Sequence, residues 1–549
     1  MKRLIALAAV VPIMCVMAFT YPGSSNTRSS SPTIRSTPSA AITSTMSAAI
    51  TSTTSAACRA TPTYGGTLTY ARQTATLSIN PFEPVNGNGD IFADTLLYEG
   101  LVMPDPKGKT NNLLPAVASS WQISNGGKTY TLNIRPGIRF SNGQLVTAAD
   151  VKYSLDTFAN PKLDADAALA YGYKSTTVVN RSTVRMQLTE RSPAILNSLS
   201  ILGAFIVPAN LVRSEGASFW SHPVGTGPFR FSSWVKGSSI TFTKNPYYWQ
   251  KGHPYLDKVV YDFASNDNSR ILDLETHQAQ EIDGVPYSEV PSLTLQSNLV
   301  LHAAQIPEWV MLWVNHQVKP FQSLDVRQAM EYALNRVGLN KEIFDGLGTI
   351  PNSILPHFAL DAPNSKVAPY PYDLAKAKKL MHESAFPHGF NVTLNYPSGS
   401  SEYATLALVL QSEWAPLGIK LTLRSDDQPT LVQLWTTGRY DIIFPYTVAT
   451  GDIPVPDEFA GLMSIYDGDY GFYTWWKDPT ITAMVIQYLH ASDSARAQEW
   501  PRIQAALQQQ TPEFNLLDLP LVTAHLSNVC GVYNNPLGAD SLQYTWLAK

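Results

Sequence analysis

Apolar and polar positions alternate along several short stretches in the first half of the chain. In residues 129–135 the apolar residues are Tyr130, Leu132 and Ile134. Successive side chains of a strand point to opposite faces, so this stretch is predicted to be a strand with one buried face, paired in a hairpin with residues 121–124. A helix is predicted to start at Thr147, with Asp150 three residues later as its capping partner. The stretch 224–260 holds three more such strands, separated by turns rich in Gly, Pro and Asn.

The second half of the chain alternates strand and helix patterns. The apolar residues of 325–336 recur at helical spacing and predict one buried helix face. The apolar run 309–315 is predicted to be a buried central strand. From residue 390 onward, strand and helix patterns alternate up to 446, which favours a parallel sheet with helical crossovers. A further helix is expected at 501–509, with Pro501 in its first turn.

The N-terminus combines a basic start with a short apolar run. Lys2 and Arg3 precede the apolar stretch, and residues 1–19 are typical of a secretory signal. The run is too short to cross a membrane as a helix, and Pro12 interrupts it. Residues 20–63 are mostly Ser, Thr, Ala and Pro, and they are predicted to form a disordered tether.

Three fates of this N-terminal signal sequence remain open. Cys15 is a candidate for lipidation, cleavage after Ala18 is the second possibility, and an uncleaved signal anchor is the third. All three place the body of the protein outside the cytoplasm, either tethered to the outer face of the cytoplasmic membrane or periplasmic. The other two cysteines, Cys58 and Cys530, permit one disulfide in an exported chain.

Composition and motifs exclude several classes of function. The formal net charge is −4 and no basic run is present, so nucleic acid is not expected as a partner. The Gly-Lys-Thr sequence at 127–129 lacks the earlier Gly and the following helix of a phosphate loop. Ser233 and Lys236 have a Ser-x-x-Lys spacing but fall at a strand end, and His316 has no second His at ligand spacing. We therefore expect no enzyme activity, no metal and no cofactor.

Several separate blocks together resemble one family. They are the stretch 224–260 (VGTGPFRF…NPYYWQKGHPYLDKVV), the stretch 130–155 (YTLNIRPGIRFSNG…TAADV), the helix 325–336 (DVRQAMEYALNR) and the strand start LGIKL at 417–421. In this order they resemble the extracytoplasmic solute-binding proteins, family 5, of ABC importers. That family includes oligopeptide-, dipeptide- and nickel-binding proteins. The resemblance covers residues 65–526.

The resemblance implies the fold. We expect an α/β, two-lobed periplasmic-binding-protein-like fold of type II, similar to cluster C, with mixed sheets, a hinge and a ligand cleft between the lobes. The expected first lobe is 64–266, with a subdomain at about 82–189, and the second lobe is 267–509. The tail 510–549 returns to the first lobe. Because the first and last segments then share a lobe, a Cys58–Cys530 bridge is sterically possible.

The resemblance also implies a binding residue. Asp452, in the sequence GDIPVP, stands where peptide binders have an Asp that receives the ligand's ammonium group, and a buried cation needs such a partner. Ala449 replaces the bulky residue that many peptide binders carry. This difference leaves a sugar, an amine or a modified peptide open beside a peptide. Further candidates for the cleft wall are the following aromatic residues, although residues in such patterns more often belong to a core: Tyr446, Trp309, Trp313 and Trp475.

The implied function is that of the solute-binding component of an ABC importer. Such a protein captures a peptide or other small solute outside the cytoplasmic membrane and delivers it to the permease. Its expected partners are the solute and the ABC permease and ATPase subunits, and it is expected to be a monomer. Two alternatives stay open: an extracellular sensor or chaperone-like binding protein on the same fold, and a secreted hydrolase, for which no nucleophile and base are visible.

Overall fold

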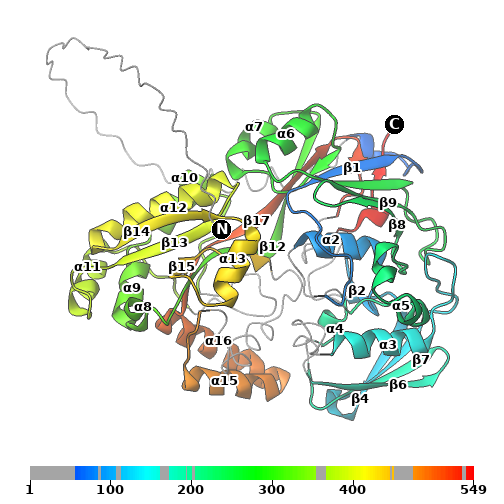
Figure 1. Ribbon diagram of the computed structural model, residues 1–549, viewed down its shortest axis with the longest axis horizontal. Helices are drawn as coiled ribbons and strands as arrows, with labels where there is room; N and C mark the ends of the chain where they lie inside the picture. Colours follow the sequence, from blue (N-terminus) through cyan, green and yellow to red (C-terminus); the bar gives the residue numbers. More distant parts are fainter. Residues whose placement is uncertain are drawn as a thin grey trace, which may run out of the picture.

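The computed structural model describes residues 56–83, 88–106, 113–160, 172–192, 195–200, 204–353, 367–445, 448–449, 474–533 and 540–549. Figure 1 shows them as two lobes that lie side by side. Two long antiparallel strands, β12 (Leu299–Val314) and β17 (Glu513–Leu526), run from one lobe into the other. One mixed sheet therefore extends through both lobes, in the order β14-β13-β15-β12-β17-β11-β1-β10-β9-β8, with β16 (Val448–Ala449) beside β12.

The first lobe is built on the β1 end of this sheet. β1 (Thr67–Arg72) pairs in parallel with β10 (Lys258–Phe263). From β10 the sheet continues antiparallel through β9 (Ser239–Lys244) to β8 (Phe229–Val235). These three strands are the ones predicted within 224–260, and that prediction is confirmed.

The two glycines that open the 224–260 block allow a close approach of two backbones. Helix α2 (Asn88–Leu97) ends against them. A Cβ atom on Gly227 would lie 2.4 Å from the carbonyl oxygen of Leu96, and one on Gly225 would lie 2.1 Å from that of Leu97. No side chain fits there, so only Gly lets this turn close onto the helix.

The aromatic turn of the same block is held by one buried carboxylate. The hydroxyl of Tyr248 donates to Glu99 at 3.0 Å, and the indole of Trp249 donates to it at 2.9 Å. Burial raises the pKa of Glu99 to about 7, although these hydrogen bonds act in the opposite direction. The turn is therefore a scaffold element that fixes the segment after α2.

A second sheet forms the lower right of Figure 1. Its order is β4 (Ala118–Ser124), β5 (Thr129–Ile134), β7 (Thr183–Leu188) and β6 (Tyr173–Asn180). The predicted hairpin is its first pair. Helix α3 (Ala148–Phe158) begins at the expected place, because the amide of Thr147 donates to Asp150 at 2.9 Å. All these elements lie inside the segment for which we expected a subdomain.

The second lobe contains the predicted parallel strands. β13 (Asn391–Pro397) pairs in parallel with β14 (Lys420–Asp426) and with β15 (Ile442–Ile443). The helices of this lobe are α8 (Lys319–Gln322), α9 (Leu324–Tyr332), α10 (Arg336–Ile343), α11 (Leu374–Glu383), α12 (Ser401–Trp414), α13 (Gln428–Thr436), α15 (Pro479–His490) and α16 (Asp493–Gln510). Because α16 begins after the cap residue Ser492, Pro501 lies inside this helix, and the prediction that placed it in the first turn was wrong.

The elements that follow residue 267 lie beside strands of the first lobe. Helix α6 (Asp267–Glu275) contacts β1, and β11 (Glu281–Ile282) pairs with both β1 and β17. These elements and α7 (Val290–Thr294) therefore precede the crossing, which β12 makes. We propose that the first lobe extends to β12 and that the chain returns through β17.

Further short elements lie in the first lobe. They are η1 (Ala56–Arg59), β2 (Val102–Pro104), β3 (Leu113–Pro115), α4 (Ile195–Ser198), α5 (Ala209–Glu215), η4 (Gly216–Ser221), β18 (Val529–Cys530) and β19 (Trp546–Leu547). Cys58 and Cys530 form a disulfide, with 5.3 Å between their Cα atoms, so the start of the described chain is tied to its tail.

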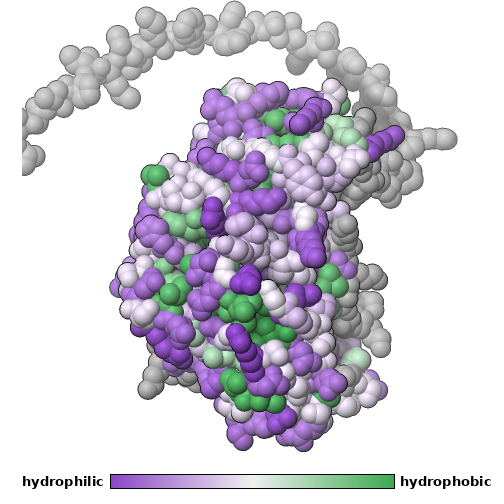
Figure 2. Space-filling model, turned by 90° about the vertical axis from the view of Figure 1, so that its right-hand side faces the viewer, coloured by the Kyte–Doolittle hydropathy of each residue, from purple (hydrophilic) through white to green (hydrophobic). Residues whose placement is uncertain are grey.

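The outer surface of the first lobe is mostly polar. Figure 2 views this side and shows smaller apolar areas among polar ones. Exposed apolar side chains on its strands include Ile123 of β4 and Val235 of β8. In the part of the chain that the structure describes, no helix is both long and apolar enough to cross a bilayer.

Candidate functional site

A cavity of about 470 Å³ lies where the two lobes meet. Its size falls in the range of sites that enclose small ligands. Several parts of the chain contribute: the segment after β1, the loop after β10, the turn after β11, the middle of β12 and β17, the end of α10, the loop between β13 and α12 with the first turns of α12, and the residue after β14. The lining residues are Gln73, Thr74, Ala75, Leu77, Ser265, Gly284, Val285, Tyr287, Val310, Phe344, Pro397, Ser398, Gly399, Ser400, Glu402, Tyr403, Leu406, Asp427, Leu519, Leu521 and Val522.

The carboxyl ends of two parallel strands of the second lobe, β13 and β14, lie at this cavity. β13 ends at Pro397 and the loop 398–400 follows it, while Asp427 follows β14. Ser400 accepts a hydrogen bond from the amide of Tyr403 and caps α12, while Asp427 accepts one from the amide of Thr430 and caps α13. Ligands of α/β proteins gather at such strand ends.

The first lobe contributes an extended segment with anchored ends. The amide of Gln73 donates to Asp283 at 2.6 Å, and the amide of Leu77 donates to Asp90 at 2.6 Å. Between these anchors, the backbone groups of Thr74 and Ala75 make no hydrogen bond within the described residues. The segment therefore offers backbone donors and acceptors to a solute in the cavity.

One hydrogen bond joins the two sides of the cavity. The amide of Tyr287, just after β11, donates to Oε1 of Glu402 in the first turn of α12 at 3.0 Å. Burial raises the pKa of Glu402 to about 7, and the Tyr287 amide lowers it. The pKa of Asp427 is lowered by its hydrogen bonds with Thr430. The cavity wall thus combines Asp427, whose pKa is lowered, with Glu402, whose pKa is raised to about 7.

Comparison with known proteins gives the family. Residues 112–470 match the middle part of the bacterial extracellular solute-binding proteins, family 5.

This chain belongs to that family.

The glutathione-binding protein GsiB of Salmonella typhi is 31% identical over 331 residues, which cover 60% of this chain and 64% of GsiB. The aligned part thus spans less than two thirds of that relative. GsiB of Escherichia coli O1:K1 is 28% identical over 457 residues, covering 80% of this chain and 86% of GsiB. Among solved structures, AgaA of A. tumefaciens in complex with agropinic acid superimposes with a TM-score of 0.78 at 26% identity, covering 88% of this chain and 99% of AgaA. The expected two-lobed α/β fold is thereby confirmed.

The structure places Trp313 of this solute-binding protein in a core rather than on the cavity wall. Its side chain is 4% exposed and packs edge-to-face against Trp435, with ring centroids 5.6 Å apart. Met311 belongs to the same core cluster as Trp313, whereas Val310 of the same strand lines the cavity. The strand face that carries Trp313 therefore turns away from the cavity.

Trp475 also lies outside the set of cavity-lining residues. Its backbone φ is +62°, and its ring lies so close to Gly438 that a Cβ there would be 2.6 Å from the indole nitrogen. That nitrogen is buried and has no hydrogen-bond partner among the described residues. Trp475 therefore fills space beside the turn that follows α13.

Other candidates lie on or next to β12. Trp309 pairs with Val448, and Glu308 pairs with Ala449. The structure describes the backbone of Trp309 and Ala449 but not their side chains. Tyr446, Asp452 and Cys15 lie outside the described residues.

Sequence reasoning missed the segment 73–77, Tyr287 and Glu402. The turn-rich sequence Pro-Ser-Gly-Ser between a strand and a helix was a usable signal for the second-lobe wall, because such a loop ends a parallel strand. The pairing of Tyr287 with Glu402 had no local signal, since 115 positions separate them.

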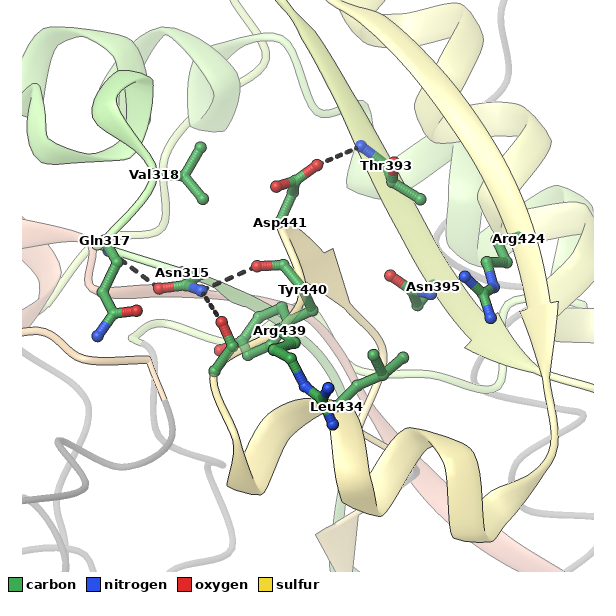
Figure 3. A pocket seen from close by; sticks show the side chains of 11 residues that line it. Asn315, Gln317, Val318, Thr393, Asn395, Arg424, Leu434, Arg439, Tyr440 and Asp441 are labelled. Carbon is green, nitrogen blue, oxygen red and sulfur yellow. Dashed lines mark hydrogen bonds between the residues drawn. The ribbon is translucent and has the colours of Figure 1, made fainter.

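A second cavity, of about 350 Å³, lies within the second lobe between the sheet and α13 (Figure 3). The side-chain amide of Asn315 donates to the carbonyls of Gly438 and Tyr440 at 2.8 Å, and the amide of Thr393 donates to Asp441. The cavity is confined to one lobe, so it does not have the placement of the first.

Metal ligation finds no support in the described part of the chain. No group of three or more His, Cys, Asp or Glu side chains that could hold an ion occurs there. His316 is buried, and its Nε2 lies 2.9 Å from the carbonyl oxygen of Pro512. Burial lowers the pKa of His316 to about 3, so this residue is a neutral structural side chain.

Proposed function

We propose that this protein is the solute-binding component of an ABC importer. It captures a small solute in the cavity between its lobes, outside the cytoplasmic membrane, and presents the loaded form to a permease. The observation that carries the proposal is the position of the 470 Å³ cavity, which residues from both sides of the β12–β17 crossing line. A solute bound there contacts both lobes at once, so binding favours the closed arrangement.

The relatives support small solutes as ligands. GsiB binds glutathione, and the structure of AgaA contains agropinic acid. The cavity wall fits such ligands, since it mixes apolar side chains such as Tyr287 and Phe344 with backbone and hydroxyl groups. Delivery to permease and ATPase subunits, and tethering of the exported chain through Cys15, are parts of the same proposal.

Asp452 remains our proposed partner for an ammonium group of the solute. Its neighbour in sequence, Ala449, pairs with Glu308 of β12, and Val310 of that strand lines the cavity. The chain therefore reaches the strand that walls the cavity three residues before Asp452. This placement supports a role at the same site.

A binding screen tests the proposal. Purified protein is mixed with peptides, opines, sugars and amines, and binding is read from thermal shifts and native mass spectrometry. We expect one class to bind with micromolar or better affinity and to reduce the radius of gyration in solution scattering. Hydrolysis of a solute without stable binding would contradict the proposal. For a solute with a free amine, Asp452→Asn is expected to weaken binding at least tenfold.

A further inference from the structure

The charged residues on the cavity wall are all acidic. Among the lining residues, Glu402 and Asp427 carry carboxylates, and the others are apolar, hydroxyl or amide residues or glycine. Both acids come from the second lobe, one at the start of α12 and one at the start of α13. A solute that enters the described part of the cavity thus meets negative charge on one wall.

The arginines nearest to this wall are already engaged by other groups. Arg270 is fully buried, and it donates to Asp267 at 2.6 Å and to the carbonyls of Asp283, Ala264 and Gly284. Arg72 forms ion pairs with Asp283 and with the tail of the chain. The charge of Arg270 lowers the pKa of Glu402, but the contacts described for both arginines are with groups other than Glu402 and Asp427.

Glu402 keeps room for another donor. Its Oε1 accepts the Tyr287 amide, and the described residues supply no further hydrogen bond to the carboxylate. A carboxylate accepts about four hydrogen bonds. A half-buried anion with unused acceptors is stabilised most by a cationic donor.

We propose that the cavity selects solutes that carry an ammonium or guanidinium group, and that Glu402 is the residue that determines this selectivity. The solute cation donates to the Glu402 carboxylate while that carboxylate also holds the Tyr287 amide. One side chain of the second lobe then contacts both the solute and the segment after β11. The inference rests on the proposed function and adds Glu402 as a second carboxylate for the solute cation, in addition to Asp452.

The chain offers a matched control on the same helix. Glu413 also lies in α12, is also half-buried, and also accepts a backbone amide, that of Asn335, at 3.2 Å. Burial raises its pKa to about 7, as for Glu402. Glu413 does not line the cavity. A Gln substitution therefore makes the same chemical change at both positions, but only one of them faces the solute.

The test uses solute pairs that differ in one charge. Each cationic peptide or amine is compared with its acetylated, neutral counterpart by calorimetry on the full chain. We expect the cationic member to bind at least tenfold tighter, Glu402→Gln to reduce this ratio about tenfold, and Glu413→Gln to leave it unchanged. Asp427→Asn, which keeps a capping side chain, is expected to reduce the ratio less.

The outcomes distinguish a failure of the proposed cation selectivity from a failure of the proposed solute-binding function. Equal binding of both members of each pair, or an unchanged ratio in Glu402→Gln with a normal melting temperature, overturns the inference and leaves a solute-binding protein. Failure of every solute to bind the wild-type protein overturns the proposed function, and the inference with it.

Discussion

Arg72 and Asp540, which are 468 positions apart in the sequence, form a buried ion pair with 2.6 Å between Nη1 and Oδ2. The same guanidinium pairs with Asp283 at 3.0 Å and stacks on the ring of Phe92, 3.5 Å from its centroid. Arg72 ends β1, and the cavity segment begins at the next residue. The tail of the chain and the turn after β11 therefore fix the direction in which the chain enters the solute site.

Removal of this cation is expected to destabilise the first lobe strongly. In Arg72→Met, Asp283 and Asp540 stay buried without a counter-charge, which should cost about 3–5 kcal/mol of unfolding free energy in urea titrations. Arg502 supplies the control, because it is 69% exposed and pairs with Glu499 on the same helix. Arg502→Met should cost less than about 1 kcal/mol. Equal effects of the two substitutions would refute the role assigned to Arg72.

Two glycines of the 224–260 block are required for different reasons: Gly227 for close packing and Gly237 for its backbone conformation. In Gly227→Ala the new methyl group meets a backbone carbonyl of α2, so we expect a loss of about 2–3 kcal/mol. Gly237 has a φ of +74° and open space around it, so Gly237→Ala should cost only about 1 kcal/mol for the left-handed conformation. Thermal unfolding of both variants checks the order. A larger loss for Gly237→Ala would contradict the packing argument.

The disulfide between Cys58 and Cys530 should add measurable stability. It closes a loop of 472 positions, and reduction frees the unfolded chain from that constraint. We expect dithiothreitol to lower the unfolding free energy by about 2–4 kcal/mol. The Cys58→Ser/Cys530→Ser variant should match the reduced protein and be insensitive to the reductant. A wild-type protein with identical curves in both conditions would contradict this expectation.

Glu513 gives stability a dependence on pH. It lies opposite Trp313 in the β12–β17 ladder, and burial raises its pKa to about 8 against a hydrogen bond from that indole. Between pH 4.5 and 8 the unfolded chain releases this proton while the folded chain keeps it, so stability falls as the pH rises through that window. The full effect is on the order of 4 kcal/mol.

Substitution of this acid should flatten the profile. Glu513→Gln is expected to lose less stability than the wild type between pH 5 and pH 9, measured by urea unfolding at each pH. Glu383→Gln, at an exposed position of α11, should follow the wild-type curve. If the unfolding free energy of Glu513→Gln falls with pH as steeply as that of the wild type, Glu513 is not the group that causes the pH dependence.

Local patterns were sufficient for most of the elements. The alternation in 129–135, the capping residues at Thr147 and the helix predicted at 325–336 depend on neighbours in sequence, and the structure has each of them, although that helix, α9, ends at Tyr332. Pro501 shows where such reasoning fails. Proline is common in the first turn of a helix, yet the cap at Ser492 makes α16 start at Asp493, eight residues before Pro501.

Contacts between distant segments were beyond local patterns. A strand was expected to begin at Tyr440, but the described strand there is β15 (Ile442–Ile443). The carbonyl of Tyr440 accepts a hydrogen bond from the side-chain amide of Asn315, and the carbonyl of Asp441 accepts one from the backbone amide of Asn315. The solute cavity likewise depends on which strands meet at the crossing. The family resemblance predicted that a cleft exists, but not that Glu402 would line it.

The ladder between β12 and β17 is interrupted midway. Pairing runs from Leu299–Leu526 to Ala304–Leu521 and resumes at Glu308–Leu519, with a further shift after Val310. A gap in the hydrogen bonds is the least stiff part of a strand pair, so rotation of one lobe against the other concentrates there. We expect each end of the strand pair to stay with its own lobe, so that the residues between Ala304 and Met311 set how far the solute cavity can open.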